Sequence, residues 1–185
     1  RLDNRPVILS FGGSLGARKI NEAAADLIAW SSRDDRFQHI HAYGQYGKWF
    51  PELLEKKGVD LKAHKNLDIR EYINNMPVCM AAADLVICRA GAITLTEIQA
   101  QGKASLLIPS PNVAENHQYH NAMALVSRNA AEILEEKDLT GDSLIAMVKK
   151  MISDPIKLKE YQDNARAMAI LDSSERIYQV IKEVL

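Results

Sequence analysis

The sequence predicts an α/β domain with a Rossmann-like, doubly wound parallel sheet flanked by helices. Short apolar runs alternate with longer segments whose apolar residues recur at helical spacing, which is typical of βαβ units. The length of 185 residues suits one domain, and 47% hydrophobic with 25% charged residues is typical of a globular fold. Because crossovers between parallel strands are right-handed, helices are expected on both faces of the sheet.

Each expected element follows from its local composition. The first strand, 6–11, is an apolar run that stops at Gly12 and Gly13, and the helix over 17–31 carries one apolar stripe. Gly58 and Gly102 each end a helix. Further strands are expected at 37–42, 67–69, 85–88, 105–108 and 131–134, and further helices at 45–57, 76–83, 92–101, 118–128, 140–153, 155–170 and 173–185.

Charge and cysteine content exclude several classes of protein. Lys and Arg total 23 against 24 Asp and Glu, so the net charge of -1 argues against a general nucleic-acid binder. Cys79 and Cys88 lie in apolar stretches without disulfide or zinc spacing, which fits a reducing cytosol. The chain starts without Met on an expected strand, so we expect it to be a piece of a longer protein.

The first of three informative loops, 11–16, reads Phe-Gly-Gly-Ser-Leu-Gly. Its glycines, Gly13 among them, allow a tight turn and close approach to a ligand, and the next helix start offers N–H groups to an anion. Ser14 adds a hydroxyl donor. The spacing matches neither GxGxxG nor a P-loop. A tight turn without a ligand is the alternative.

The second loop, 89–97, again brings small residues to a helix start after a buried strand. The N–H groups that follow Gly91 are candidates to hold a phosphate, and they belong to Ala92, Ile93 and Thr94. Glu97 lies about one turn into the helix, where its carboxylate suits the two hydroxyls of a ribose. The alternative for Glu97 is an acid that only complements the helix dipole.

The third loop, 109–118, ends in consecutive polar residues where a helix should begin. Asn116 is expected to be the N-cap, beside His117, and the amide of Gln118 suits a hydroxyl-bearing ligand such as a sugar. An ordinary capped helix start is the alternative. Since loops after parallel strands share one edge of the sheet, the three together predict a nucleotide-sugar pocket.

These loops resemble those of the lipid I N-acetylglucosaminyltransferases of peptidoglycan synthesis, the MurG family. Residues 11–21 are similar to the family's glycine-rich loop, reading Phe-Gly-Gly-Ser-Leu-Gly-Ala-Arg-x-x-Asn. Residues 89–97 resemble its nucleotide-sugar signature, reading Arg-Ala-Gly-Ala-x-Thr-x-x-Glu. Residues 108–122 resemble its sugar loop, with Ile-Pro-x-Pro and Asn-His-Gln-x-x-Asn-Ala. The motifs occur in order over nearly the whole chain.

The resemblance implies the C-terminal half of a two-domain GT-B glycosyltransferase that binds UDP-GlcNAc. The family transfers GlcNAc to lipid I with inversion, giving lipid II. By resemblance, substrate binding is assigned to Ser14 (diphosphate), the backbone of Ala92, Ile93 and Thr94 (α-phosphate), Glu97 (ribose), the backbone of Ile73 (uracil) and Gln118 (GlcNAc ring). Gly13, Gly91, Asn116 and His117 are further candidates, His117 standing where some relatives carry a second Gln.

The resemblance also implies what lies outside the donor site. No catalytic residue, metal ligand or cofactor is assigned, since the general base is expected on an N-terminal domain that the chain lacks. That domain is also expected to bind lipid I and to make most membrane contact, with the full enzyme peripheral on the cytoplasmic face of the bacterial inner membrane. Within the chain, we expect a donor domain over 1–172. We expect the helix over 173–185 to expose an apolar face that packs on the missing domain, formed by Ile177, Val180, Ile181 and Leu185.

Three other functions fit the same motifs. One is a nucleotide-sugar-binding subunit without catalysis of its own, and another is a related glycolipid UDP-glycosyltransferase. The third is a UDP-sugar epimerase of GT-B type, which should carry additional acid–base carboxylates near the sugar.

Overall fold

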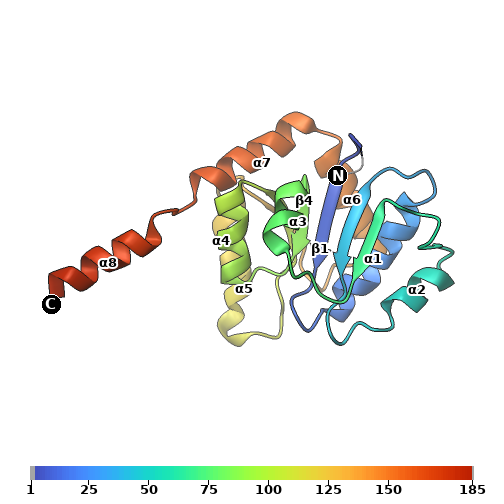
Figure 1. Cartoon of the computed structure of the whole chain (residues 1–185), viewed down its shortest axis with the longest axis horizontal. Coiled ribbons are helices and arrows are strands. Elements are labelled where there is room, and N and C mark those ends of the chain that lie inside the picture. Colours follow the sequence, from blue (N-terminus) through green and yellow to red (C-terminus); the bar gives the residue numbers. More distant parts are fainter. Residues whose placement is uncertain (1–2, 185) are drawn as a thin grey trace.

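Six parallel strands form the central sheet of the computed structural model, which describes residues 3–184 (Figure 1). They are β1 (Val7–Phe11), β2 (Gln38–Ala42), β3 (Leu67–Arg70), β4 (Leu85–Cys88), β5 (Ala104–Leu107) and β6 (Glu132–Ile133). Their order across the sheet is β3-β2-β1-β4-β5-β6. The order reverses between β1 and β4, and ligands of open α/β sheets bind at such a point, outside the carboxyl ends of the strands. The predicted doubly wound parallel sheet is confirmed.

Helices cover both faces of the sheet. The helices are α1 (Arg18–Ser31), α2 (Phe50–Lys56), α3 (Met76–Ala82), α4 (Ala92–Gln101), η1 (Ala114–Asn116), α5 (His117–Val126), α6 (Gly141–Ile152), α7 (Pro155–Ala167) and α8 (Ser173–Val184). Neighbouring residues of β1 pack on opposite sides: Ile8 joins the apolar cluster with α1 and α6, and Leu9 joins that with α3, α4 and α5. Burial on both faces explains why the strands are continuous apolar runs.

One predicted helix boundary is wrong by five residues. The sequence places a helix over 45–57, whereas α2 begins at Phe50. Residues before it form a turn around Gly44 and Gly47, where a Cβ on Gly47 would lie 2.3 Å from the carbonyl oxygen of Tyr43. Periodicity in the sequence does not reveal that backbone contact. The last helix was expected to reach Leu185, which lies outside the described residues.

Helix α8 projects away from the rest of the chain (Figure 1). None of its residues is buried, and the expected apolar face is exposed at Ile177, Val180 and Ile181, by 61%, 60% and 46%. Over residues 3–184, no helix combines the length and the apolar character that crossing a bilayer requires.

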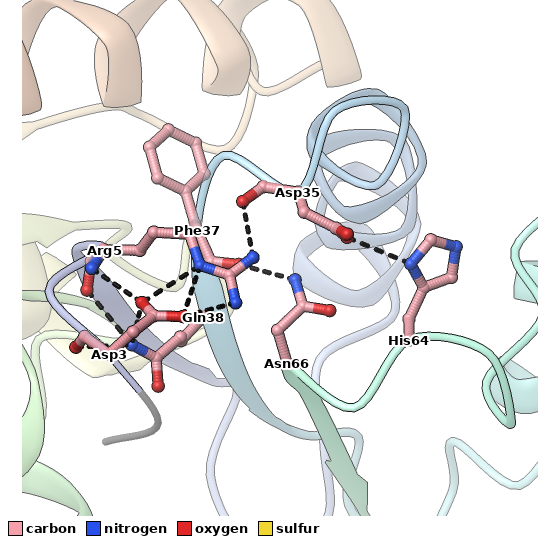
Figure 2. Close-up of polar contacts among 7 residues, drawn as sticks. All are labelled: Asp3, Arg5, Asp35, Phe37, Gln38, His64 and Asn66. Carbon is pink, nitrogen blue, oxygen red and sulfur yellow. Dashed lines mark hydrogen bonds and ion pairs between the residues drawn. The ribbon is translucent and has the colours of Figure 1, made fainter.

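Polar side chains tie together the amino ends of the first three strands (Figure 2). Arg5 donates to the carboxylate of Asp3, with Nε 2.9 Å from Oδ2. The Gln38 amide donates to the carbonyl oxygens of Asp3 at 3.1 Å and Arg5 at 3.2 Å. Asn66 donates to the carbonyl oxygen of Phe37 at 2.7 Å. These contacts lie at the edge of the sheet opposite the three loops.

Backbone contacts hold the glycine-rich loop at the other edge of the sheet. The Gln45 amide donates to the Ser14 carbonyl at 3.1 Å. Gly16 and Gly44 both have positive φ, +85° and +76°, and they touch. A Cβ on Gly44 would lie 2.1 Å from the Gly16 nitrogen, and one on Gly16 would lie 2.2 Å from the Tyr43 carbonyl oxygen. The loop therefore needs glycine at both positions.

We predict that Gly44→Ala lowers the free energy of unfolding by about 3 kcal/mol, because it adds both a steric clash and left-handed strain. The matched control is Gly58→Ala, since Gly58 also has positive φ, +82°, but has open space around its Cβ direction. That variant should cost about 1 kcal/mol, from strain alone. Urea unfolding of both variants measures the difference, and equal losses would contradict a close Gly16–Gly44 contact.

A hydroxyl links two buried histidines inside the sheet. Ser10 Oγ lies 2.7 Å from His39 Nε2 and 2.7 Å from His41 Nδ1. Burial lowers the pKa of His39 to about 3. Burial, and then the neighbouring His39, also lower the pKa of His41 well below its ordinary value. Both rings are therefore neutral in the folded chain near neutral pH.

We predict that stability falls as the pH drops below about 6.5, the ordinary histidine pKa. The unfolded chain binds these protons before the folded chain does, so stability is full above pH 6.5 and is lost progressively toward pH 3. For His39 the loss between pH 7 and pH 5 should be about 2 kcal/mol, and His41 adds a loss of the same sign. Urea unfolding of His39→Gln should give a shallower pH slope than the parent, whereas exposed His120→Gln should keep the parent slope. Identical slopes for all three chains would be incompatible with this account.

Candidate functional site

A cavity of about 230 Å³ lies where the first, second and fourth strands end at the carboxyl edge. Its walls come from the glycine-rich loop, the segment after β3 and the first turns of α4. The lining residues are Phe11, Gly13, Ser14, Ala42, Tyr72, Ile73, Met76, Thr94 and Glu97. Gly13, Ser14, Ile73, Thr94 and Glu97, all named from the sequence, are thus brought together around one space.

The start of α4 presents backbone donors beside this cavity. Gly91 is the N-cap in extended conformation, with φ -72° and ψ 141°, and no side chain caps the helix. The first helical bond runs from the Leu95 amide to the Gly91 carbonyl at 3.0 Å. The amides of Ala92, Ile93 and Thr94 precede that bond, so they have no acceptor within the helix and can bind an anion.

Glu97 places a carboxylate in the cavity wall, near the end of β4. Burial, followed by the charge of Glu97, raises the pKa of Cys88 to about 12. Cys88 is completely buried and stays a thiol, so it is not a nucleophile. Over residues 3–184, no group of three or more His, Cys, Asp and Glu side chains is arranged to hold a metal ion.

The segment after β3 supplies part of the apolar lining of the cavity. Ile73 is 3% exposed and belongs to the core, and it also lines the cavity. Arg70 fixes the turn, because Nε donates to Asp68 Oδ1 at 2.7 Å and Nη1 donates to Asn75 Oδ1 at 2.9 Å. Four lining residues were not predicted to bind a ligand: Phe11, Ala42, Tyr72 and Met76. Phe11 and Ala42 end β1 and β2, a position that could have identified them.

The sugar loop, residues 109–118, lies apart from this cavity. Gln118 Oε1 accepts a hydrogen bond from the Ser110 amide at 3.0 Å, so this side chain closes its own loop. His117 is exposed, and its Nδ1 lies 3.0 Å from the Ala114 carbonyl oxygen. Asn116 occupies the N-cap position of α5, as expected, but makes no side-chain capping bond. Its left-handed backbone, φ 51°, differs from the extended conformation that capping side chains need.

A second, smaller cavity of about 80 Å³ lies against the sugar loop. It is lined by Pro109, Ser110, Pro111, Asn116, Tyr119, Glu135, Glu136 and Lys137. The residues named from the sequence therefore form two groups, one around the larger cavity and one on the sugar loop. The start of α4, with Gly91, Ala92 and Ile93, adjoins Thr94 of the first group.

Curated relatives match along nearly the whole chain. The UDP-N-acetylglucosamine--N-acetylmuramyl-(pentapeptide) pyrophosphoryl-undecaprenol N-acetylglucosamine transferase of Desulforamulus reducens is 39% identical over 99% of this chain and 50% of its own length. The protein of that name from Acetivibrio thermocellus is 42% identical over 97% of this chain and 48% of its own length. The chain thus spans about half the length of these relatives.

Solved structures agree with the fold. The crystal structure of Acinetobacter baumannii MurG is similar with a TM-score of 0.82 and 28% identity, over 99% of this chain and 53% of that one. The UDP-GlcNAc 2-epimerase from Neisseria meningitidis, bound to UDP-GlcNAc, has a TM-score of 0.68 at 15% identity, over 98% of this chain and 45% of that one. At that identity, the second likeness concerns the fold alone.

The family resemblance seen in the sequence is confirmed by these relatives and by one further match. The glycosyltransferase family 28 C-terminal domain matches residues 7–181, which include the glycine-rich loop, the start of α4 and the sugar loop. The chain belongs to the glycosyltransferase family 28 C-terminal domain family.

Proposed function

We propose that this chain is the donor-binding half of an inverting transferase that moves GlcNAc from UDP-GlcNAc to lipid I, giving lipid II. The observation that carries the proposal is the larger cavity, where backbone amides, a hydroxyl and one carboxylate meet at the switch point of the sheet. The names of the curated relatives support the choice of donor and acceptor.

The proposed roles divide the donor among the walls of the cavity. Uracil binds at the backbone of Ile73, and Glu97 accepts hydrogen bonds from the ribose hydroxyls. The diphosphate lies between the Ser14 hydroxyl and the amides at the start of α4. Gln118 binds the GlcNAc ring, with Asn116 and His117 beside it. Because the diphosphate is met by neutral donors, the site needs no excess of basic residues.

These hydrogen-bond donors also explain how the site helps UDP to leave the sugar. As UDP leaves, negative charge grows on the diphosphate while positive charge grows on the sugar ring. Fixed N–H groups at a helix N-terminus stabilise that leaving charge more strongly in the transition state than in the ground state. The acceptor hydroxyl must attack from the opposite face with a general base near it. In the proposal, that base lies on an N-terminal domain outside this chain.

The same proposal assigns the remaining surfaces. Residues 1–172 form the donor domain, and the helix over 173–185 packs on the N-terminal domain through its apolar face. Exposed Ile177, Val180 and Ile181 support that assignment, since an apolar stripe of this kind normally packs against a partner. In the proposal, lipid I and most membrane contact belong to the N-terminal domain, and the whole enzyme is peripheral on the cytoplasmic face of the bacterial inner membrane.

We predict that Glu97→Ala weakens UDP binding about ten- to a hundredfold, because the variant loses two hydrogen bonds to a charged acceptor. Ser14→Ala should cost only a few fold, the value of one neutral hydrogen bond. The measurement is calorimetric titration of this chain with UDP, UDP-GlcNAc, UDP-GalNAc and UDP-glucose. UDP-GlcNAc should bind more tightly than the other two sugar nucleotides.

Glu52→Gln is the control for charge removal, because Glu52 is exposed on α2 and pairs with Lys56 away from the cavity. It should leave every affinity unchanged. If the parent chain binds none of the uridine nucleotides, the proposal fails. Preference for UDP-glucose would instead support a glycolipid glycosyltransferase.

We also predict that this chain alone does not convert UDP-GlcNAc and lipid I to lipid II, since the proposal puts the general base and acceptor site on another domain. The measurement is product formation from labelled UDP-GlcNAc in detergent. Turnover by this chain alone would refute the division of labour between the two halves.

A further inference from the structure

The guanidinium of Arg89 joins three segments that are distant in the sequence. Nη1 donates to the carbonyl oxygen of Ile108 at 3.2 Å and to that of Pro109 at 3.1 Å. Nη2 forms an ion pair with Glu136. The side chains of Arg89 and Glu136 are only 17% and 16% exposed, so water competes little for these contacts. This is a built-in connection rather than a surface ion pair.

These contacts link the sugar loop to the start of α4. Arg89 directly follows β4 and lies two residues before Gly91, the N-cap of α4. Ile108 and Pro109 follow β5 and lead into the sugar loop. A second bond joins the same parts, from Asn121 Nδ2 in α5 to the Ala90 carbonyl oxygen at 3.2 Å. The 89–91 segment is thus attached to the start of the sugar loop at Pro109 and to the helix that follows the loop at Asn121.

We propose that Arg89 is a positioning residue. Together with Glu136, it fixes the distance between the sugar loop and the N-terminus of α4. One donor molecule must span that distance. The inference rests on the proposed function and adds a specificity role to it. Arg89 lines neither cavity and Glu136 lines only the smaller one, against the sugar loop, so the pair acts on the sugar end of the donor. The nucleotide end of the donor binds to the walls of the larger cavity, which these two residues do not form.

An arginine is required by the shape of this contact. Its planar fork reaches two carbonyl oxygens and one carboxylate at the same time, which the single ammonium of lysine does not reproduce. Arg89→Lys therefore keeps the charge but releases the loop. Glu136→Gln keeps the size of the partner and removes its charge.

The test is calorimetric titration of the parent chain, Arg89→Lys and Glu136→Gln with UDP and with UDP-GlcNAc. Both variants should bind UDP-GlcNAc about five- to tenfold more weakly, and UDP within about twofold of the parent. Arg36→Lys is the matched control. Arg36 forms an ion pair with Asp34 and lies over the ring of Trp30. It precedes β2 and so lies at the edge of the sheet opposite the sugar loop. The control variant should leave both affinities unchanged.

A second measurement needs no ligand. Amide hydrogen exchange at Ser110, whose N–H is bonded to Gln118, should become at least several-fold faster in Arg89→Lys and in Glu136→Gln, but not in Arg36→Lys. Circular dichroism checks that each variant is folded. If Arg89→Lys does not fold, Glu136→Gln alone provides the test.

The outcomes separate the two proposals. A parent chain that binds no uridine nucleotide overturns the proposed function and this inference with it. A parent that binds, with variants that lose UDP and UDP-GlcNAc equally or lose neither, overturns the positioning role alone. Unchanged exchange at Ser110 in both variants also overturns it.

Discussion

Burial of the parallel sheet on both faces is the constraint on which the rest of the molecule depends. Every residue of β1, β4 and β5 is buried, so these strands contribute packing and backbone hydrogen bonds while the ligand-facing groups lie outside them. Ligand chemistry is therefore confined to the edges, where the strands end. The amino edge is held together by Arg5, Gln38 and Asn66. The carboxyl edge is left for the loops.

The loops achieve their positions mainly through backbone groups. Gly16 and Gly44 allow two turns to touch, and the Gln45 amide binds the Ser14 carbonyl at 3.1 Å. The start of α4 adds three amides without a helical acceptor. A pocket built from neutral donors fits a chain whose net charge is -1, because recognition of a phosphate here requires orientation rather than a basic surface.

Local patterns in the sequence were sufficient for the sheet, for most helices and for four residues of the larger cavity, whereas Ile73 came from the family resemblance. These features depend on neighbours within a few positions: apolar runs, helical spacing, and glycines or small residues after a strand. The predicted start of α2 was wrong because the true start depends on contacts that Gly44 and Gly47 make with residues elsewhere in the chain. The contacts of Arg89 lie 19, 20 and 47 residues away, so no local pattern indicated them.

The exposed apolar residues acquire a common explanation under the proposed function. Tyr72 and Ile93, 57% and 79% exposed, lie at the cavity and at the start of α4, and Ile177 and Val180 lie on α8. In a chain of this composition, single exposed apolar residues need no explanation, but a continuous stripe on a projecting helix does. A second domain that closed over the donor would cover the cavity rim, and α8 would hold it there. Closure would also remove water from the diphosphate, where the amides at the start of α4 stabilise charge most effectively in a dry site.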